Sequence, residues 1–284
     1  MAESGLIIVD KPADWTSHDV VGKLRGIAGT RRVGHAGTLD PMATGVLVIG
    51  VEKATRLLGH LALTEKVYEA TILLGVTTNT DDAEGEVLAT TPVDVAEADI
   101  RAGIAALTGP IMQVPPQVSA IKVNGERAYK LARAGEEVEL KARPITVHSF
   151  EVTSIDGPSI RATIRCSSGT YIRSLARDLG AGLGVGGHLT SLRRTSVGPY
   201  GLAQARTIEQ LGQECTILPI GDAVSAAFPR RDVTEEEARV VSHGGRLPVA
   251  GIGKGPIGVF GPDGALLALV EEQGRIAKPL AVFV

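Results

Sequence analysis

Short apolar runs that end at proline or glycine set the pattern of this chain. The run Leu6-Ile7-Ile8-Val9 predicts a buried strand, and Asp10-Lys11-Pro12 ends it because proline cannot donate to a strand ladder. A second run, Val46 to Gly50, predicts another strand directly after a glycine-rich turn at residues 34–45. Many short strands with few helices favour an α+β fold on a mixed, largely antiparallel sheet.

Four helices are predicted where a capping residue precedes apolar residues at helical spacing. The first helix would be capped by Thr16 with Asp19 and end at Gly29, and the second would be capped by Asp94 with Glu97 and end at Gly109-Pro110. The third would be capped by Ser168-Gly169-Thr170. The fourth would be capped by Thr234 with Glu237 and end at Gly244-Gly245. The third helix would bury Ile172 and Leu175 and leave Arg173 and Arg177 together on another face.

Residues 66–75 alternate as a half-buried strand requires, with Tyr68, Ala70 and Ile72 on one face. Tyr68 is therefore expected to point inward near the start of this strand. Residues 145–156 and 159–167 predict two further strands.

The chain is long enough for one large domain and one small one. Beyond Pro219 short Val/Leu/Ile-rich strands follow one another, so we predict a first domain over residues 1–224 and a small barrel over residues 225–284. Within the first domain, a strand at 118–123 is expected to turn into a short basic helix at 126–134.

Charge is unevenly distributed along the chain. The net charge is −3, which does not favour a polyanion, because RNA affinity comes largely from lysine and arginine that neutralise phosphates. Residues 11–35, 121–145 and 165–194 nevertheless carry +3, +2 and +4, and the rest of the chain carries −12. A solvated surface can show the same segregation, so charge alone does not establish RNA binding.

The sequence predicts no metal site, disulfide framework or membrane segment. Cys166 and Cys215 form no CxxC pair, and neither lies in a His/Cys cluster of metal-ligand spacing. The apolar run at residues 6–9 is too short for a signal sequence or a membrane span. We therefore expect a cytoplasmic protein.

Four residues are candidates for chemistry, although each also has an ordinary structural explanation. Asp40 in its Gly/Pro loop can simply satisfy turn amides, and His35 can bond within the same loop. An inward Tyr68 can be part of the core, and Arg173 on a helix can be solvated or ion-paired. Their chemistry alone indicates a site with a carboxylate, a phenol and a guanidinium, and leaves the reaction open.

Five separated blocks resemble, in the same order, the motifs of TruB-type pseudouridine synthases. The blocks are Asp10-Lys11-Pro12 with Trp15-Thr16-Ser17, Gly34-His35-Ala36-Gly37-Thr38-Leu39-Asp40-Pro41-Met42-Ala43-Thr44-Gly45, Lys66-Val67-Tyr68-Glu69 with Gly75-Val76-Thr77-Thr78 and Asp82-Ala83-Glu84-Gly85, Val114-Pro115-Pro116-Gln117-Val118-Ser119-Ala120-Ile121-Lys122, and Gly169-Thr170-Tyr171-Ile172-Arg173-Ser174-Leu175. They cover most of residues 5–200. The resemblance implies the pseudouridine synthase fold with an appended RNA-binding barrel, called PUA.

The resemblance also implies the reaction, which converts the T-loop uridine at position 55 of tRNA into pseudouridine. The N-glycosidic bond breaks, the uracil rotates and C5 forms the new bond, so we expect neither a cofactor nor a metal. Asp40 is implied as the catalytic carboxylate, with Arg173 as its ion-pair partner. Tyr68 is implied to lie against the uracil and to help remove the C5 proton. Whether Asp40 attacks the sugar, attacks the base or removes a sugar proton stays open.

Five further positions match substrate-binding residues of the family. His35 is implied to stand in for the base that the enzyme displaces, since extruding a stacked base costs a few kcal/mol. Tyr171 and Leu192 are implied to line the uracil pocket, and Lys11 and Asp82 are expected to contribute to substrate binding.

The expected partner is the T-arm of tRNA, bound by a monomer without an obligate protein partner or a membrane. Residues 121–145 correspond to an inserted arm that closes over RNA, with Gly125 and Gly135 as hinges. Two alternatives remain: a guide-RNA-dependent, dyskerin-like synthase, which shares several of the motifs, and an RNA-binding or tRNA-folding protein whose catalysis is secondary.

Overall fold

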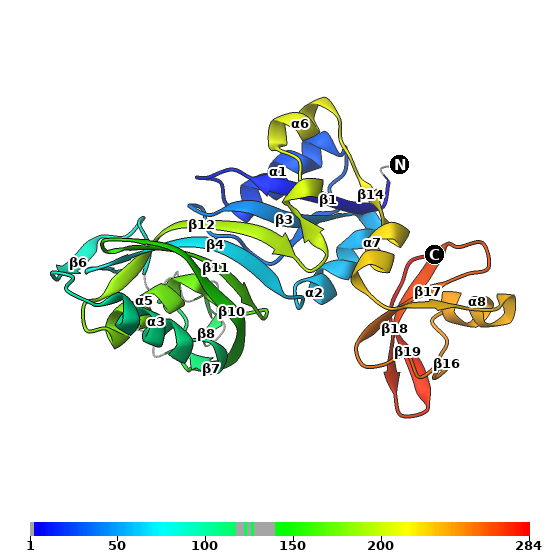
Figure 1. Cartoon of the computed structure of the whole chain (residues 1–284). Helices are drawn as coiled ribbons and strands as arrows, with labels where there is room; N and C mark the ends of the chain where they lie inside the picture. Colours follow the sequence, from blue (N-terminus) through cyan, green and yellow to red (C-terminus); the bar gives the residue numbers. More distant parts are fainter. Residues whose placement is uncertain (1–2, 118–121, 124–125, 128–139) are drawn as a thin grey trace. The chain divides into compact units, whose positions relative to one another are not determined.

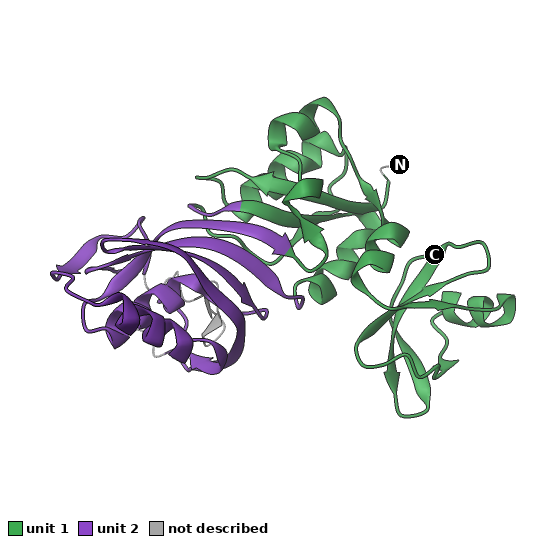
Figure 2. Cartoon of the chain, in the orientation of Figure 1, with its two compact units in different colours: residues 1–41, 45–62, 197–284 green, residues 42–44, 63–196 purple. Residues whose placement is uncertain are grey.

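The computed structural model describes residues 3–117, 122–123, 126–127 and 140–284 (Figure 1). The chain forms two compact units: unit 1 contains residues 1–41, 45–62 and 197–284, and unit 2 contains residues 42–44 and 63–196 (Figure 2). In both units helices pack on mainly antiparallel strands, so the predicted α+β class is confirmed. The chain leaves unit 1 between Pro41 and Met42, one residue after Asp40.

Unit 1 is built around β1 (Gly5–Lys11), which pairs antiparallel with β3 (Thr44–Val51) and β14 (Leu218–Pro219). Strand β2 (Val33–Ala36) pairs with the other edge of β3. The remaining elements around these strands are α1 (Ser17–Ile27), η1 (Glu52–Leu57), α2 (Leu58–Leu61), β13 (Tyr200–Gly201), η2 (Leu202–Gln204), α6 (Ile208–Gln213) and α7 (Ile220–Ala227).

Both faces of β1 are covered, which explains why its sequence is continuously apolar. Ile7 and Val9 belong to a core cluster that includes Leu24 of α1 and Leu211 of α6. Their neighbours Leu6 and Ile8 belong to a second cluster on the opposite side of the strand, as expected from side chains that alternate between faces.

The C-terminal strands form a curled five-stranded sheet with its own core. Their order is β15 (Arg230–Asp232), β17 (Pro256–Phe260), β18 (Leu266–Gln273), β19 (Ile276–Val282) and β16 (Leu247–Pro248), and only β15 and β17 are parallel. Helix α8 (Glu235–Ser242) contributes Val241 to this core. The domain boundary predicted near residue 225 stays a prediction, and that residue lies inside α7.

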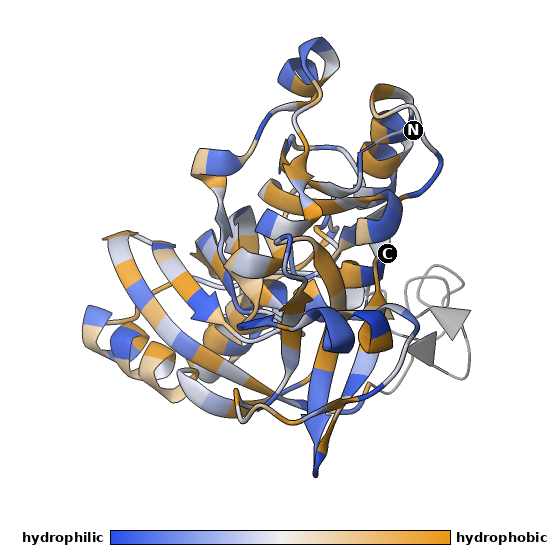
Figure 3. Ribbon diagram, turned by 90° about the vertical axis from the view of Figure 1, so that its right-hand side faces the viewer, coloured by the Kyte–Doolittle hydropathy of each residue, from blue (hydrophilic) through white to orange (hydrophobic). Residues whose placement is uncertain are grey.

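Unit 2 has a sheet with helices on one face. Its strand order is β12 (Gly187–Val197), β4 (Lys66–Leu74), β11 (Ser159–Cys166), β10 (Arg143–Asp156) and β7 (Gly109–Gln113), and the smaller hairpins are β5 (Val76–Thr78) with β6 (Val87–Thr90) and β8 (Lys122–Val123) with β9 (Glu126–Arg127). Hydrophobic and hydrophilic residues alternate along its long strands (Figure 3). Helices α3 (Glu97–Ala106) and α5 (Ile172–Gly182) pack together, and a Cβ at Gly103 would lie 2.9 Å from Leu179 Cδ1.

The predicted N-terminal caps were confirmed at two of the four predicted helices. Capping boxes start α1 at Thr16 and α8 at Thr234. The prediction that Asp94 caps α3 is wrong, because the N-cap is Ala96, which makes no side-chain cap bond. Residues 168–170 do not cap α5 either: Thr170 donates to Ser167 O, and Tyr171 is the N-cap.

The predicted insertion differs from expectation where the structure describes it. Lys122–Val123 is a strand as predicted, but Glu126–Arg127 pairs with it as a second strand and does not begin a helix. The remainder of the predicted helix at 126–134, and the two expected hinges Gly125 and Gly135, lie outside the described residues.

Candidate active site

Asp40 lies in the loop between β2 and β3 of unit 1 and is partly exposed. Gly37 and Gly45, at φ +80° and +99°, flank its turn. Side chains other than glycine rarely adopt these backbone angles, so both positions require glycine. The turn predicted over residues 34–45 is therefore shorter than expected: residues 34–36 belong to β2 and residues 44–45 to β3, and residues 37–43 form the loop that presents the carboxylate.

Groups from residues 11–17 hold this loop on both sides of Asp40. The buried Ser17 hydroxyl donates to Leu39 O (3.1 Å) and accepts from Leu39 N–H (3.0 Å). On the other side, Pro41 O accepts from Lys11 Nζ at 3.0 Å and from Asp14 N–H at 2.9 Å. The two residues that flank the carboxylate are therefore both fixed by hydrogen bonds.

Lys11 is fully buried, and its ammonium also donates to Pro12 O and Trp15 O, each at 2.7 Å. An ammonium has three protons, so three protein carbonyls provide an acceptor for each of them. This geometry makes Lys11 a support for the Asp40 loop. The predicted contact of Lys11 with substrate stays a prediction.

His35 is in β2 and is half-buried. The ring of the exposed His18, on α1, meets its ring edge to face with centroids 5.5 Å apart. Aromatic rings prefer this arrangement over a face-to-face sandwich. The predicted role of His35 in displacing a base stays a prediction.

In unit 2 the strands place two predicted pocket residues on the buried side. Tyr68 of β4 is 7% exposed, as predicted from its alternation, and Leu192 of β12 is 6% exposed. Lys66 precedes Tyr68 on the same face and is also buried. Burial, together with the charge of Arg194, lowers the pKa of Lys66 to about 8.

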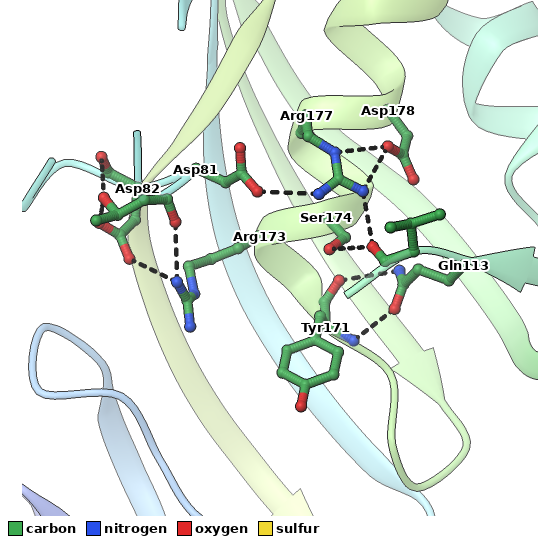
Figure 4. Close-up of polar contacts among 10 residues, drawn as sticks. Asp81, Asp82, Gln113, Tyr171, Arg173, Ser174, Arg177 and Asp178 are labelled. Carbon is green, nitrogen blue, oxygen red and sulfur yellow. Dashed lines mark hydrogen bonds and ion pairs between the residues drawn. The ribbon is translucent and has the colours of Figure 1, made fainter. Parts of the chain in front are cut away.

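Arg173 of α5 forms the central ion pair of unit 2 (Figure 4). Its Nη1 lies 3.4 Å from Asp82 Oδ2 and donates to Thr80 O at 2.8 Å. Asp82 Oδ1 in turn accepts from Thr80 Oγ1 at 2.5 Å and from Glu84 N–H at 3.1 Å. Asp82, predicted as a substrate-binding residue, is therefore also the residue that neutralises Arg173.

A second ion pair lies one helical turn further along α5. Arg177 Nη1 lies 3.1 Å from Asp81 Oδ2, so the arginines predicted to share a helix face both contact the turn at Asp81 and Asp82. Burial raises the pKa of Asp81, and the charges of Arg177 and Arg173 oppose this effect.

The predicted residues fall into two groups according to the unit that contains them. Lys11, His35 and Asp40 belong to unit 1; Tyr68, Asp82, Tyr171, Arg173 and Leu192 belong to unit 2. The structure brings Arg173 and Asp82 into contact, whereas the pairing of Arg173 with Asp40 stays a prediction.

Several polar residues of unit 2 were not predicted as buried from the sequence, namely Lys66, Gln113 and Arg194, and neither was the half-buried Asp81. Only Lys66 had a usable signal, because it shares the inward alternation of Tyr68.

Within the described residues, no group of three or more His, Cys, Asp and Glu side chains could hold a metal ion. In that same part of the chain, no helix combines the length and apolar character needed to cross a bilayer.

Comparison with known proteins identifies related sequences along nearly the whole chain. The family "TruB family pseudouridylate synthase (N terminal domain)" matches residues 25–172. Residues 173–221 match "tRNA pseudouridylate synthase B C-terminal domain", and residues 228–284 match "tRNA Pseudouridine synthase II, C terminal".

Two relatives show how far the similarity extends. The tRNA pseudouridine synthase B of Thermobifida fusca (strain YX) is 63% identical, with 98% of each chain covered. The protein of the same name from Mycobacteroides abscessus is 54% identical, with 99% of this chain and 97% of the relative covered. Among solved structures, a Cbf5-Nop10-Gar1 complex contains a chain that is 28% identical with a TM-score of 0.77, covering 99% of this chain and 85% of that one.

Proposed function

Because this chain belongs to the TruB family of pseudouridylate synthases, we propose that it is an isomerase that converts the T-loop uridine at position 55 of tRNA into pseudouridine. The observation that carries this proposal is the 63% identity, over 98% of both chains, to a relative named tRNA pseudouridine synthase B. The assignment to position 55 rests on the resemblance of residues 10–17, 34–45 and 169–175 to motifs of the family.

In this proposal Asp40 is the carboxylate that starts the reaction. Hydrogen bonds on Leu39 and Pro41 support the assignment, because a catalytic group must be held within a fraction of an ångström of its productive position. The atoms balance within the uridine: the bond from C1′ to N1 breaks, the bond from C1′ to C5 forms, C5 loses its proton, and N1 gains one. Tyr68 assists the last proton transfer.

Arg173 orients Asp40 when RNA is bound, and Asp82 keeps Arg173 in place. A guanidinium has five N–H donors in a fixed planar fork, so it can serve two carboxylates at once. Arg173 contacts Asp82 Oδ2 and Thr80 O through Nη1. Tyr171 and Leu192 complete the uracil pocket, and His35 occupies the position of the displaced base.

We further propose that the protein acts in the cytoplasm as a monomer, without a guide RNA or an obligate protein partner. Support for guide independence comes from the higher identity to relatives named tRNA pseudouridine synthase B, 54–63%, than to the 28% identical chain of the Cbf5-Nop10-Gar1 complex.

The decisive experiment uses purified protein and an unmodified tRNA transcript, with pseudouridine mapped by carbodiimide-stop sequencing. We expect one stop, at the T-loop uridine, without any added RNA or protein. An unmodified transcript that becomes modified only with a guide RNA would favour the guide-dependent alternative. A transcript that shifts on a gel but stays unmodified would favour the RNA-binding alternative.

A further inference from the structure

Gln113, the last residue of β7, makes two hydrogen bonds to a single residue, Tyr171 (Figure 4). Its Nε2 donates to Tyr171 O at 3.0 Å, and its Oε1 accepts from Tyr171 N–H at 2.9 Å. The side-chain amide thus pairs with Tyr171 as the backbone of a neighbouring strand would. Gln113 is only 1% exposed, so both bonds are shielded from water.

This contact holds the residue at which α5 begins. Tyr171 is the N-cap residue, with extended backbone angles and no side-chain cap bond, and its carbonyl also accepts the first helical bond from Leu175 N–H at 3.2 Å. Gln113 therefore fixes, by two hydrogen bonds, the backbone of the residue at which the helix begins. Any shift of Tyr171 would move the first turn of α5, which carries Arg173.

The residue after Gln113 strengthens the same attachment. Val114 O accepts from Ser174 Oγ at 3.0 Å and from Arg177 Nη2 at 2.8 Å. Ser174 and Arg177 are three positions apart and are therefore neighbours on the surface of α5. The end of β7 thereby fixes this side of α5, while Arg173 is held by Asp82.

We infer that Gln113 is a positioning residue that sets the place of Tyr171 in the uracil pocket. The inference rests on the proposed function, since the pocket is part of that proposal. Gln113 acts on the reaction through Tyr171 and does not contact the uridine. A misplacement of about 1 Å in a group near the reacting atoms can cost about 100-fold in rate. Loss of the two hydrogen bonds from Gln113 to Tyr171 should therefore lower the turnover rate more than the affinity for RNA.

The test compares Gln113→Met, which keeps the length of the side chain and removes both hydrogen bonds, with Thr108→Val as a matched control. Thr108 also bonds a backbone carbonyl, that of Ile104 at 2.9 Å, just before β7. We expect Gln113→Met to lower the single-turnover rate at saturating tRNA at least about tenfold, with Kd for tRNA within about threefold of wild type. Thr108→Val should match wild type. Equal rates for Gln113→Met and wild type would overturn the inference.

A double-mutant cycle separates positioning from a general loss of structure. In a Tyr171→Ala background the ring is already absent, so Gln113→Met should have much less effect on the rate than it has alone. Fully additive losses would show that Gln113 does not act through Tyr171.

A measurement without catalysis keeps this inference separate from the proposed function. The chain has four tyrosines, so 3-fluorotyrosine labelling gives few ¹⁹F resonances, and Tyr171→Phe identifies that of Tyr171. Gln113→Met should shift or broaden this resonance, whereas that of the buried Tyr200 should stay in place. An unchanged Tyr171 resonance would show that Gln113 does not position Tyr171, even if the wild type proved inactive on tRNA.

Discussion

Arg173 and Asp82 form an ion pair at 3.4 Å, in which the two side chains are only 6% and 4% exposed. Charges that are removed from water at this depth are stable only when they are paired and hydrogen-bonded. Thr80 provides such bonds to both partners, through its carbonyl to Arg173 and its hydroxyl to Asp82. This pair connects α5 to the turn that follows β5, so its loss should affect both folding and catalysis.

Asp82→Ala should destabilise the protein by about 3–5 kcal/mol, because it removes the carboxylate that is paired with the buried Arg173 guanidinium. Asp82→Asn should cost less, since the amide oxygen can still accept from Thr80 and Glu84. Urea unfolding measures both values. A smaller loss for alanine than for asparagine would contradict this account of the pair.

Arg173→Lys should slow single turnover by about 100-fold or more, although the charge is preserved. An ammonium cannot reproduce the planar fork that would hold Asp82 and orient Asp40, and a misplaced carboxylate is costly. Arg101→Lys is the control and should retain most activity, because Arg101 on α3 is 57% exposed and its only role in the described residues is an ion pair with Glu97 within the same helix. Similar losses in the two variants would assign Arg173 a structural role only.

Asp40→Asn should lower turnover by about 1,000-fold or more while tRNA binding is kept, because the change removes the charge and preserves the shape. Asp14→Asn is the control: Asp14 is exposed, its N–H bonds Pro41 O in the same loop, and asparagine tolerates its φ of +66°. Rates come from pseudouridine mapping and affinities from filter binding. Repeated turnover by Asp40→Asn would remove Asp40 from its proposed role.

Features that depend on neighbouring residues in the sequence were predicted well. The capping boxes at Thr16 and Thr234, the inward Tyr68 and the strands at 145–156 and 159–167 all follow from spacing within a few residues. The attachment of the α5 N-terminus could not be predicted in this way, since Gln113, which bonds Tyr171, lies on a different element.

Strand β12 was missed because its sequence resembles a polar loop. Residues 190–196 contain serine, threonine and two arginines, yet Arg194 is 1% exposed and the strand pairs with β4. Burial of an arginine depends on contacts made in the folded state, which no local pattern shows. The ion pair of Arg173 with Asp82 was missed for the same reason, and the resemblance supplied only the identity of the two residues.

Lys66 should make stability depend on pH in the alkaline range. Its pKa is about 8 in the folded protein and 10.5 in the reference state, so between these values the unfolded chain binds a proton that the folded chain has lost. Stability of the wild type should therefore rise from pH 8 to pH 10 relative to Lys66→Met, by up to about 3 kcal/mol.

Urea unfolding of the two proteins at matched pH measures this difference. Burial raises the pKa of the nearby Cys166 thiol to about 11, and loss of the Lys66 charge would raise it further, so in both proteins this thiol stays protonated over most of the range. A difference that stays constant across this range, or falls, would show that Lys66 keeps an ordinary pKa.

Whether the segment from residue 225 folds separately can be tested at Phe283. Phe283 is 4% exposed and belongs to the same core cluster as Leu6, Ile8 and Val48 of the N-terminal strands. Lys53 Nζ also donates to Phe283 O at 2.6 Å. A chain cut near residue 225 would interrupt α7 and uncover this cluster, so a point substitution tests the boundary more cleanly than truncation does.

Phe283→Ala should lower the free energy of unfolding by about 3–5 kcal/mol, the usual cost of removing a buried phenylalanine ring. Val284→Ala, at a neighbouring residue that is 59% exposed, should have little effect. If the C-terminal strands are part of one cooperative structure with β1 and β3, calorimetry should show the main transition of unit 1 shifting as a whole. A separate low-temperature transition in Phe283→Ala, with the main transition unmoved, would instead show that residues 225–284 unfold independently, because the loss would then be confined to their own core around Val241 and Val259.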